Sequence, residues 1–209
     1  MRRAMPLILI GLGIIILGVV AVPVFASQIQ YWLNKPVVLI DPSVNPGPQA
    51  PFISTQASDW FANAPKLSPT ATKVSFYTLS IPKIGLSDVR VEINGDDLKK
   101  SAIQYPGTAL PGTFGNTVIF GHSTSPFLYK VGDPVSIFNP LLQTKVGDKI
   151  VVYFDGVTYR YIVRNIAELD PDKIEVLAQR YDKYELTLVT CTPLGTYLRR
   201  FVVRAELET

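Results

Sequence analysis

Apolar and polar residues alternate along several short segments after Thr72, and this period is typical of strands with one buried face. Two such segments, Tyr77–Ile81 and Val89–Ile93, come before Asn94-Gly95, a dipeptide that favours tight turns. Asp155-Gly156 separates two further apolar segments and predicts a β-hairpin. The pattern therefore predicts a domain made mainly of β-strands.

The remaining expected strands are equally short, and no helix of more than a few turns is expected. These strands are expected at residues 117–120, 150–154, 158–163, 186–189 and 201–203. A short helix could lie within Asp96–Gln104, and Phe127–Leu142 has an irregular pattern that favours helical turns. Closely spaced strands with turn signals and little helix are typical of a small antiparallel barrel or sandwich.

An uncharged apolar run extends from Leu7 to Ala26. As a helix it would span roughly 30 Å, the thickness of the hydrocarbon core of a bilayer. Arg2 and Arg3 precede it, so residues 1–6 are expected in the cytoplasm and the rest of the chain outside. A cleaved signal peptide is the alternative, because Val24-Phe25-Ala26 resembles a cleavage site. The run is longer than the roughly 7–15 apolar residues of a signal peptide, which favours an uncleaved anchor.

Residues 27–71 form an expected extracytoplasmic linker, and residues 72–209 the folded domain. Seven prolines lie between residues 34 and 70, and they predict an extended spacer because proline removes a backbone donor and fixes φ. Asp59-Trp60-Phe61 is an aromatic cluster within this stretch. It could pack on the surface of the domain, or it could act as a lid or docking segment.

The net charge of +3 is small and the charges are interspersed, so a nucleic-acid partner is not expected. The chain has one cysteine and one histidine. An intramolecular disulfide is therefore impossible, and the usual Cys/His zinc site lacks ligands. We expect no metal and no cofactor. The single cysteine is either an inert core residue or a reactive thiol.

Three strand ends carry residues suited to acyl transfer. His122 lies just past the apolar strand expected at residues 117–120, after Gly121, and Cys191 ends the segment that begins at Leu186, just before Pro193. Arg199 and Arg200 open the next strand. A thiolate can attack a carbonyl, an imidazole can move the proton, and a guanidinium can stabilise the oxyanion. Each residue also has a structural interpretation: a buried small side chain, a hydrogen-bonded histidine and solvated charges.

Several motifs together resemble the sortase family, over roughly residues 76–207. Thr187-Leu188-Val189-Thr190-Cys191 resembles the Thr-Leu-x-Thr-Cys signature, and Arg200 follows Cys191 at a spacing of nine residues that is similar to the family pattern. Three further segments resemble the opening strand, the loop before the histidine and the histidine strand of that family: residues 80–86, 105–112 and 115–122.

This resemblance implies a closed, antiparallel or mixed β-barrel of about eight strands with short helices. It also implies that Cys191 is the nucleophile, that His122 is the general acid and base, and that Arg200 binds the oxyanion or a substrate carbonyl. Arg200 is preferred to Arg199 because its place in Arg-Phe-Val-Val-Arg matches the arginine of the family. Thr190 is expected to line the substrate site beside the nucleophile.

The implied reaction is the cleavage of a Leu-Pro-x-Thr-Gly-like sorting signal through a thioester on Cys191, followed by transfer to an amine. That amine would belong to a peptidoglycan precursor or to a lysine of a pilin-like protein. Pilin-polymerising sortases often carry an Asp-Pro-aromatic lid and a second apolar segment. Asp59-Trp60 lacks the proline, Asp41-Pro42 lacks the aromatic residue, and no second apolar run is present, so general wall anchoring is favoured.

Two other functions stay open. One is a different exported Cys/His peptidase or transpeptidase. His122 and Cys191 are 69 residues apart and in the order opposite to papain-like enzymes, which counts against the best-known types. The other is a non-enzymatic, membrane-tethered β domain that binds wall components, in which Cys191 would be buried and unreactive.

Overall fold

A computed structural model describes residues 55–61 and 67–208. The expected cytoplasmic segment 1–6, the expected anchor 7–26 and most of the expected linker lie outside these ranges. Within the described ranges, none of the helices has the length and apolar character needed to cross a membrane.

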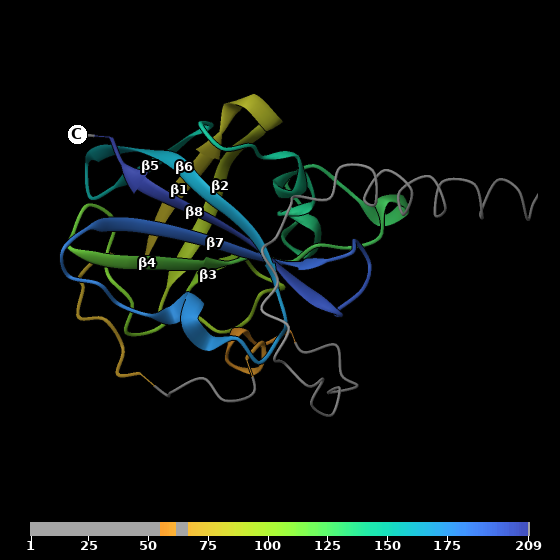
Figure 1. Ribbon diagram of the computed structural model, residues 1–209, viewed down its shortest axis with the longest axis horizontal. Helices are drawn as coiled ribbons and strands as arrows, with labels where there is room; N and C mark the ends of the chain where they lie inside the picture. Colours follow the sequence, from red (N-terminus) through yellow and green to blue (C-terminus); the bar gives the residue numbers. More distant parts are fainter. Residues whose placement is uncertain (1–54, 62–66, 209) are drawn as a thin grey trace, which may run out of the picture. The chain divides into compact units, whose positions relative to one another are not determined.

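Eight strands close into one barrel within the described residues (Figure 1). They are β1 (Phe76–Ile81), β2 (Leu86–Ile93), β3 (Ala102–Gln104), β4 (Gly115–Phe120), β5 (Lys149–Phe154), β6 (Val157–Leu169), β7 (Tyr184–Thr192) and β8 (Arg199–Leu207). Their order around the barrel is β1-β2-β3-β4-β7-β8-β6-β5. The pairs β2/β3 and β4/β7 are parallel and the other pairs are antiparallel, which confirms a closed mixed barrel.

The helices in the described residues are all short 3-10 turns. They are η1 (Ala57–Asp59), η2 (Pro82–Ile84), η3 (Pro126–Leu128), η4 (Pro134–Ser136), η5 (Asn139–Gln143) and η6 (Ile174–Leu177). The turns η3, η4 and η5 overlap residues 127–142, the stretch where the sequence favours helical turns. Proline opens η2, η3 and η4, where its missing N–H and fixed φ cost nothing.

The expected hairpin at Asp155-Gly156 is confirmed, because Phe154 of β5 pairs with Val157 of β6. Both turn residues have positive φ, 49° and 78°, as a tight hairpin turn requires. The short helix expected within Asp96–Gln104 is wrong. The backbone N–H of Leu98 donates to Thr55 O at 2.8 Å, and residues 102–104 form β3 beside β2. Pairing with other segments replaces the local bonds that a helix would need.

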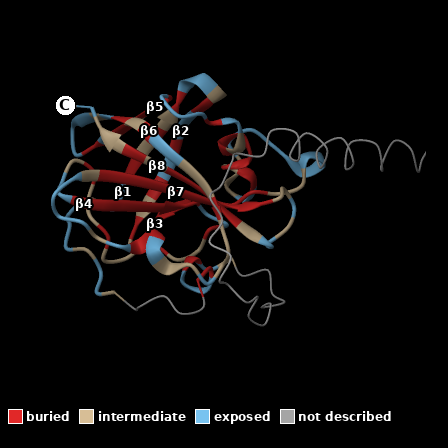
Figure 2. Ribbon diagram, in the orientation of Figure 1, coloured by how far each residue is buried: buried red, intermediate tan, exposed pale blue. Residues whose placement is uncertain are grey.

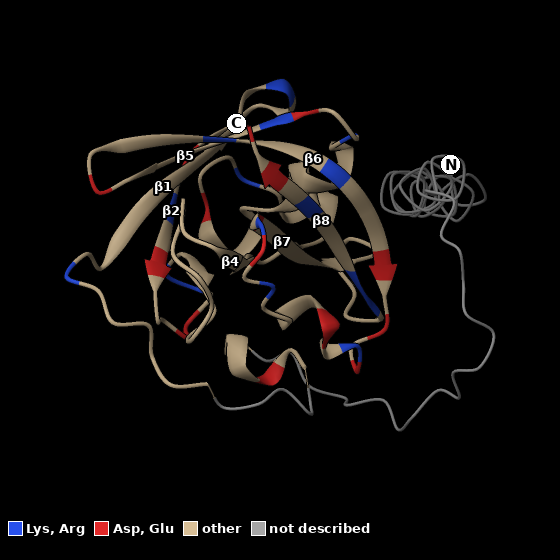
Figure 3. Ribbon diagram, turned by 60° about the vertical axis from the view of Figure 1, so that its left-hand side comes forward, with Lys and Arg blue, Asp and Glu red and all other residues tan. Residues whose placement is uncertain are grey.

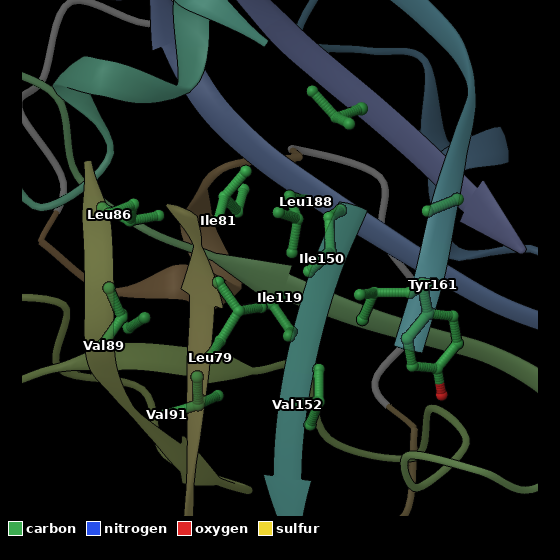
Figure 4. Close-up of a cluster of buried hydrophobic side chains, with 14 of the residues drawn as sticks. Leu79, Ile81, Leu86, Val89, Val91, Ile119, Ile150, Val152, Tyr161 and Leu188 are labelled. Carbon is green, nitrogen blue, oxygen red and sulfur yellow. The ribbon is translucent and has the colours of Figure 1, made fainter. Parts of the chain in front are cut away.

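Aliphatic side chains from the inner faces of the strands fill the barrel. Leu79 and Ile81 of β1 meet Ile119 of β4, Ile150 of β5 and Leu188 of β7 in the core (Figure 4). Each fully buried side chain of this size contributes roughly 1.5–3 kcal/mol to folding. Figure 2 shows the buried residues concentrated along β4, β7 and β8. Barrel closure also leaves no unpaired sheet edge.

The strands β4 and β7 are buried on both faces. Ile119 and Leu188 point into the barrel core, whereas Phe120 and Val189 belong to a second apolar cluster on the outer face. Burial on both faces suits residues 186–191, which are apolar apart from two threonines and are all buried. This outer cluster consists of Ala57, Trp60, Phe61, Leu98, Ile103, Tyr105, Val118, Phe120, Val176, Leu177, Val189, Cys191 and Val202.

Candidate active site

The parallel pairing of β4 and β7 delivers His122 and Cys191 to the same edge of the barrel. The register pairs Phe120 with Val189, and the N–H of Gly121 donates to Val189 O at 3.1 Å. Continuing this register by two residues sets His122 opposite Cys191. The carboxyl ends of the two strands therefore bring the single histidine beside the single cysteine.

The antiparallel pairing of β7 and β8 adds the arginine. Cys191 and Arg200 are directly paired Cα partners, and Arg200 Nη1 lies 3.6 Å from Cys191 Sγ. Arg199 instead pairs with Thr192, and its Nη2 lies 3.6 Å from Asp170 Oδ1. The structure thus brings together His122, Cys191 and Arg200, and it places the guanidinium of Arg199 at a different carboxylate.

The three side chains lie on the outer face of the barrel, where Cys191 itself belongs to the second apolar cluster. Side chains alternate between the faces of a strand, so Thr190 points the opposite way from Cys191. Its buried Oγ1 donates to Gly121 O at 2.8 Å and so ties β7 to the backbone just before His122. The substrate contact expected for Thr190 stays a prediction.

Two residues that the sequence did not single out hold the site together. Ser123 Oγ donates to Cys191 O at 2.7 Å, and the N–H of Phe138 donates to His122 O at 2.9 Å. A Cβ at Gly121 would lie 2.4 Å from the ring of Phe138, so glycine is required there for close packing. Ser123 could have been suspected from its place next to His122, whereas Phe138 gave no sequence signal.

A pair of amide side chains fixes the segment that follows β6. Asn116 Nδ2 donates to Val176 O at 2.9 Å, and its Oδ1 accepts from Thr187 Oγ1 at 2.8 Å. Gln179 Nε2 donates to Asn116 O at 3.0 Å, and its Oε1 accepts from the N–H of Asn116 at 3.0 Å. These bonds hold η6 against β4, so Val176 forms a wall of the cluster around Cys191.

The segment Thr55–Phe61 lies over the three residues. Trp60 O accepts from Arg200 Nη2 at 2.9 Å, and the Trp60 ring stands 5.5 Å from Phe120 and 5.6 Å from His122, measured between centroids. Cys191 is 1% exposed and His122 is 6% exposed. Of the two alternatives for this aromatic cluster, packing on the domain is therefore observed, and the packing is directly over the site.

Burial controls the protonation of this covered site. It raises the pKa of the Cys191 thiol above its usual value, and the nearby Arg200 charge opposes the rise. Burial also lowers the pKa of His122 to about 4, with a further lowering by Lys99. Near neutral pH the covered site therefore holds a thiol and a neutral imidazole. In the described residues no three His, Cys, Asp or Glu side chains gather as they would around a metal ion.

Comparison with known proteins identifies the fold and the family. The family model described as "Sortase domain" matches residues 79–208. Sortase A of Bacillus anthracis is 36% identical over 93 residues, which is 44% of this chain and 40% of that protein. The chain thus spans less than half the length of this curated relative.

Solved structures extend the similarity over the barrel. A Clostridium perfringens Sortase D5 transpeptidase is similar with a TM-score of 0.54 at 27% identity, covering 65% of this chain and 79% of that one. A pilus-related Sortase C of Group B Streptococcus is similar with a TM-score of 0.57 at 29% identity, covering 66% and 70%. These relatives carry different subclass letters, so the subclass stays open. Because the family model matches well over half of its residues, this chain belongs to the sortase family.

Proposed function

We propose that this protein is a cysteine transpeptidase that cleaves a Leu-Pro-x-Thr-Gly-like sorting signal and transfers the acyl group to an amine. The observation that carries the proposal is the row of His122, Cys191 and Arg200 on three neighbouring strands, with Arg200 Nη1 3.6 Å from Cys191 Sγ. A thiol, a base and a fixed cation in one row are what acyl transfer requires.

In the first stage, the sulfur of Cys191 attacks the scissile carbonyl carbon and His122 takes up the thiol proton. The tetrahedral intermediate collapses, the C–N bond breaks, and His122 gives the proton to the leaving amine. A thioester joins the donor protein to Cys191. In the second stage, an acceptor amine attacks the thioester, His122 removes its proton, and the thiol is released.

Arg200 is suited to bind the oxyanion or a neighbouring substrate carbonyl. Its Nη2 donates to the backbone carbonyl of Trp60, which is the same chemical group that a donor peptide would offer. Its buried Nε has no hydrogen-bond partner among the described residues, so a further donor is available. A guanidinium keeps its charge when buried, which suits this role better than an amine.

We further propose that the apolar run Leu7–Ala26 anchors the chain in the cell membrane, with residues 1–6 in the cytoplasm and the barrel outside. The donors would be secreted proteins with a sorting signal. The acceptor amine would come from a peptidoglycan precursor or from a lysine of another protein. Wall anchoring is favoured over pilus assembly by the absence of an Asp-Pro-aromatic motif at Asp59-Trp60.

The direct test is to incubate the full chain with Leu-Pro-x-Thr-Gly-type peptides and to measure its intact mass. A mass increase equal to the acyl fragment, located on Cys191, is the expected result, and added amine should discharge it. The Cys191→Ala variant should form no adduct. Failure of the unmodified chain to form an adduct with any peptide in a broad set would overturn the proposal.

The same experiment separates the two alternatives. A different Cys/His peptidase would form an adduct on Cys191 but would pass it to water rather than to an added amine. A non-enzymatic β domain would form none, and its thiol would also resist a charged methanethiosulfonate reagent under native conditions.

A further inference from the structure

The turn Pro126–Gly132, four residues after His122, holds apolar side chains in solvent. Phe127 is 47% exposed, Leu128 65% and Val131 85%, and the only charge in the turn is Lys130. In Figure 1 this green turn, which includes η3, projects from the barrel, and Figure 2 shows it as exposed. Single exposed apolar residues are common, but consecutive ones in one projecting turn are typical of a contact surface.

The exposure is built into the turn by hydrogen bonds. The N–H of Leu128 donates to Ser125 O at 2.9 Å, which closes η3. Buried Ser136 donates from Oγ to Lys130 O at 2.9 Å and accepts from the N–H of Lys130 at 3.2 Å. The backbone is thus fixed on both sides of Tyr129, and the side chains of Phe127 and Leu128 are presented outward by a defined structure.

The turn lies beside the connection between β7 and β8. Tyr129 lines a pocket of about 260 Å³ together with Leu194 and Ile84, and a Cβ on Gly195 would come within 3.1 Å of Ser125. Leu198, in the same connection, is also exposed. The apolar surface therefore borders the two loops that carry His122 and lead to Arg200.

We propose that the turn Pro126–Gly132 inserts into the interfacial layer of the lipid bilayer. This inference rests on the membrane attachment in the proposed function. Aromatic and aliphatic side chains with a nearby lysine suit this layer, because rings settle at the headgroup level and the lysine reaches the phosphates. The single charge, Lys130, is complementary to anionic lipid, whereas basic and acidic residues are interspersed over the rest of the barrel (Figure 3).

The polarity of the turn favours a bilayer over a protein partner. A protein interface carries about one hydrogen bond per 100–200 Å² and a polar rim. Between Pro126 and Gly132, only Tyr129 and Lys130 have polar side-chain atoms. A fluid apolar layer requires no such pattern of donors and acceptors.

Because the chain is already tethered to the membrane, a small apolar turn is sufficient to keep the domain in contact with the bilayer. Residues 27–54 separate the apolar run from the described domain, and an extended, proline-rich spacer of this length spans at most about 90 Å. Tethering at such a distance gives an effective concentration on the order of millimolar, so a weak second contact is occupied. Docking through this turn would hold the edge of the barrel that carries Cys191 and His122 at the membrane surface, where a lipid-linked amine would be found.

The test measures depth in the membrane with the full chain in a Cys191→Ala background. A Leu128→Cys substitution is labelled with an environment-sensitive fluorophore, and a Val157→Cys substitution serves as the matched control. Val157 is also exposed, and it pairs with Phe154 near the Phe76 end of β1. The turn lies near the other end of β1, which is followed by Ile84. The control label therefore lies at the opposite end of the strand from the turn. A Val131→Cys label provides a second probe of the same turn.

The labelled chains are reconstituted in vesicles of phosphatidylcholine and phosphatidylglycerol that carry a quencher on the acyl chain. Quenching at positions 128 and 131 should exceed quenching at 157 several-fold, with a blue-shifted emission. Equal quenching at the turn and at 157, or none at the turn, would overturn the docking proposal, including the case in which a protein partner covers the turn.

Acyl-enzyme formation by the unmodified chain in the same vesicles keeps the two proposals apart. Acyl-enzyme without preferential quenching would leave the transpeptidase standing and remove the docking turn. Preferential quenching without acyl-enzyme would support membrane docking and count against the proposed activity. In the Phe127→Ser/Leu128→Ser/Val131→Ser variant, acyl-enzyme formation with soluble peptide should stay within about twofold of the unmodified chain, because none of these side chains contacts Cys191.

Discussion

Cys191 and Arg200 face each other across the β7–β8 ladder, so the distance between sulfur and guanidinium is set by strand pairing. The pairing continues without a break from Glu185 and Glu206 to Thr192 and Arg199. Arg199, one residue earlier, pairs with Thr192 and lies near Asp170. These two adjacent arginines therefore have different partners, and substituting each one separately tests which of them acts in the site.

Substitution of Arg200 should affect acyl-enzyme formation far more than substitution of Arg199. Arg200→Ala removes the charge that opposes the rise in the pKa of Cys191, so the thiolate fraction falls. It also removes a donor for the oxyanion, which typically costs about 10²–10³ in rate. We expect a rate loss of at least that order for Arg200→Ala and a change of no more than a few-fold for Arg199→Ala, both measured as the rate of acyl-enzyme formation.

The pH dependence of thiol alkylation provides the control. Arg200→Ala should shift the alkylation profile to higher pH, whereas Arg199→Ala should leave it in place. If the two variants behaved alike, the assignment of Arg200 would be wrong.

Replacement of Trp60 should expose the cysteine. Trp60→Ala removes ring contacts with Phe120 and His122, and a buried tryptophan contributes about 3–5 kcal/mol of packing. If a third of this free energy is lost from the equilibrium between the covered and the open position of the segment Thr55–Phe61, the open fraction rises about tenfold. We expect modification of Cys191 by a charged methanethiosulfonate reagent to accelerate by that factor or more.

Tyr181→Ala is the matched control for this measurement, because Tyr181 is an aromatic residue that is largely exposed. Its modification rate should equal that of the unmodified chain. An unchanged rate in Trp60→Ala, with the barrel still folded, would mean that the segment does not limit access to the thiol.

Much of the barrel follows from the sequence because its strands obey a period of two. Alternation around Tyr77–Ile81 and the Asp155-Gly156 turn identify strands and a hairpin from local information alone. The row formed by His122, Cys191 and Arg200 depends on pairing between distant strands. The family resemblance identified His122 and Arg200 as the partners of Cys191, because residue spacing alone does not determine how distant strands pair.

Other parts of the site have no local signal. The covering position of Trp60 depends on a contact with Arg200, which is 140 residues away in sequence. The expected helix within Asp96–Gln104 failed for the same reason, because Leu98 pairs with Thr55 across the fold. The alternation that identifies β7 does place Thr190 and Cys191 on opposite faces, so the inward position of Thr190 could have been deduced.

The depressed pKa of His122 predicts a specific dependence of stability on pH. The unfolded imidazole has its usual pKa of 6.5, and burial lowers the native value to about 4. Between these values the unfolded state binds more protons than the native state. The free energy of unfolding should therefore be unaffected by this group above pH 6.5 and should fall as the pH decreases toward 4. One pKa unit corresponds to about 1.4 kcal/mol, so the total loss is about 3 kcal/mol.

Urea unfolding of the full chain and of His122→Gln at pH 7, 5.5 and 4.5 would measure this effect. Other titrating groups are common to both chains, so the difference between the two curves isolates the imidazole. The free energy of unfolding of the unmodified chain, taken relative to that of His122→Gln, should fall as the pH decreases from 7 to 4.5. Curves that stayed parallel over this range would show that the native imidazole titrates normally.

Gln179 should control the binding of the donor peptide through the position of η6. Its side chain bridges the backbone of Asn116 and Leu177, with Nε2 donating to Leu177 O at 3.1 Å. Gln179→Ala removes these bonds and loosens η6 at Leu177, next to Val176 in the cluster around Cys191, while the bond from Asn116 Nδ2 to Val176 O remains. Since the reacting groups themselves are untouched, we expect KM for the donor peptide to rise several-fold while kcat changes by less than about twofold.

Hydrogen exchange distinguishes this effect from a general loss of stability. In Gln179→Ala, amide exchange should accelerate in residues 174–179 and stay unchanged in β5, whose strand pairs do not involve η6. Glu175→Ala, an exposed substitution within the same turn, should alter neither KM nor exchange. Faster exchange throughout the barrel, or a fall in kcat with KM unchanged, would assign Gln179 to overall stability rather than to the wall of the binding site.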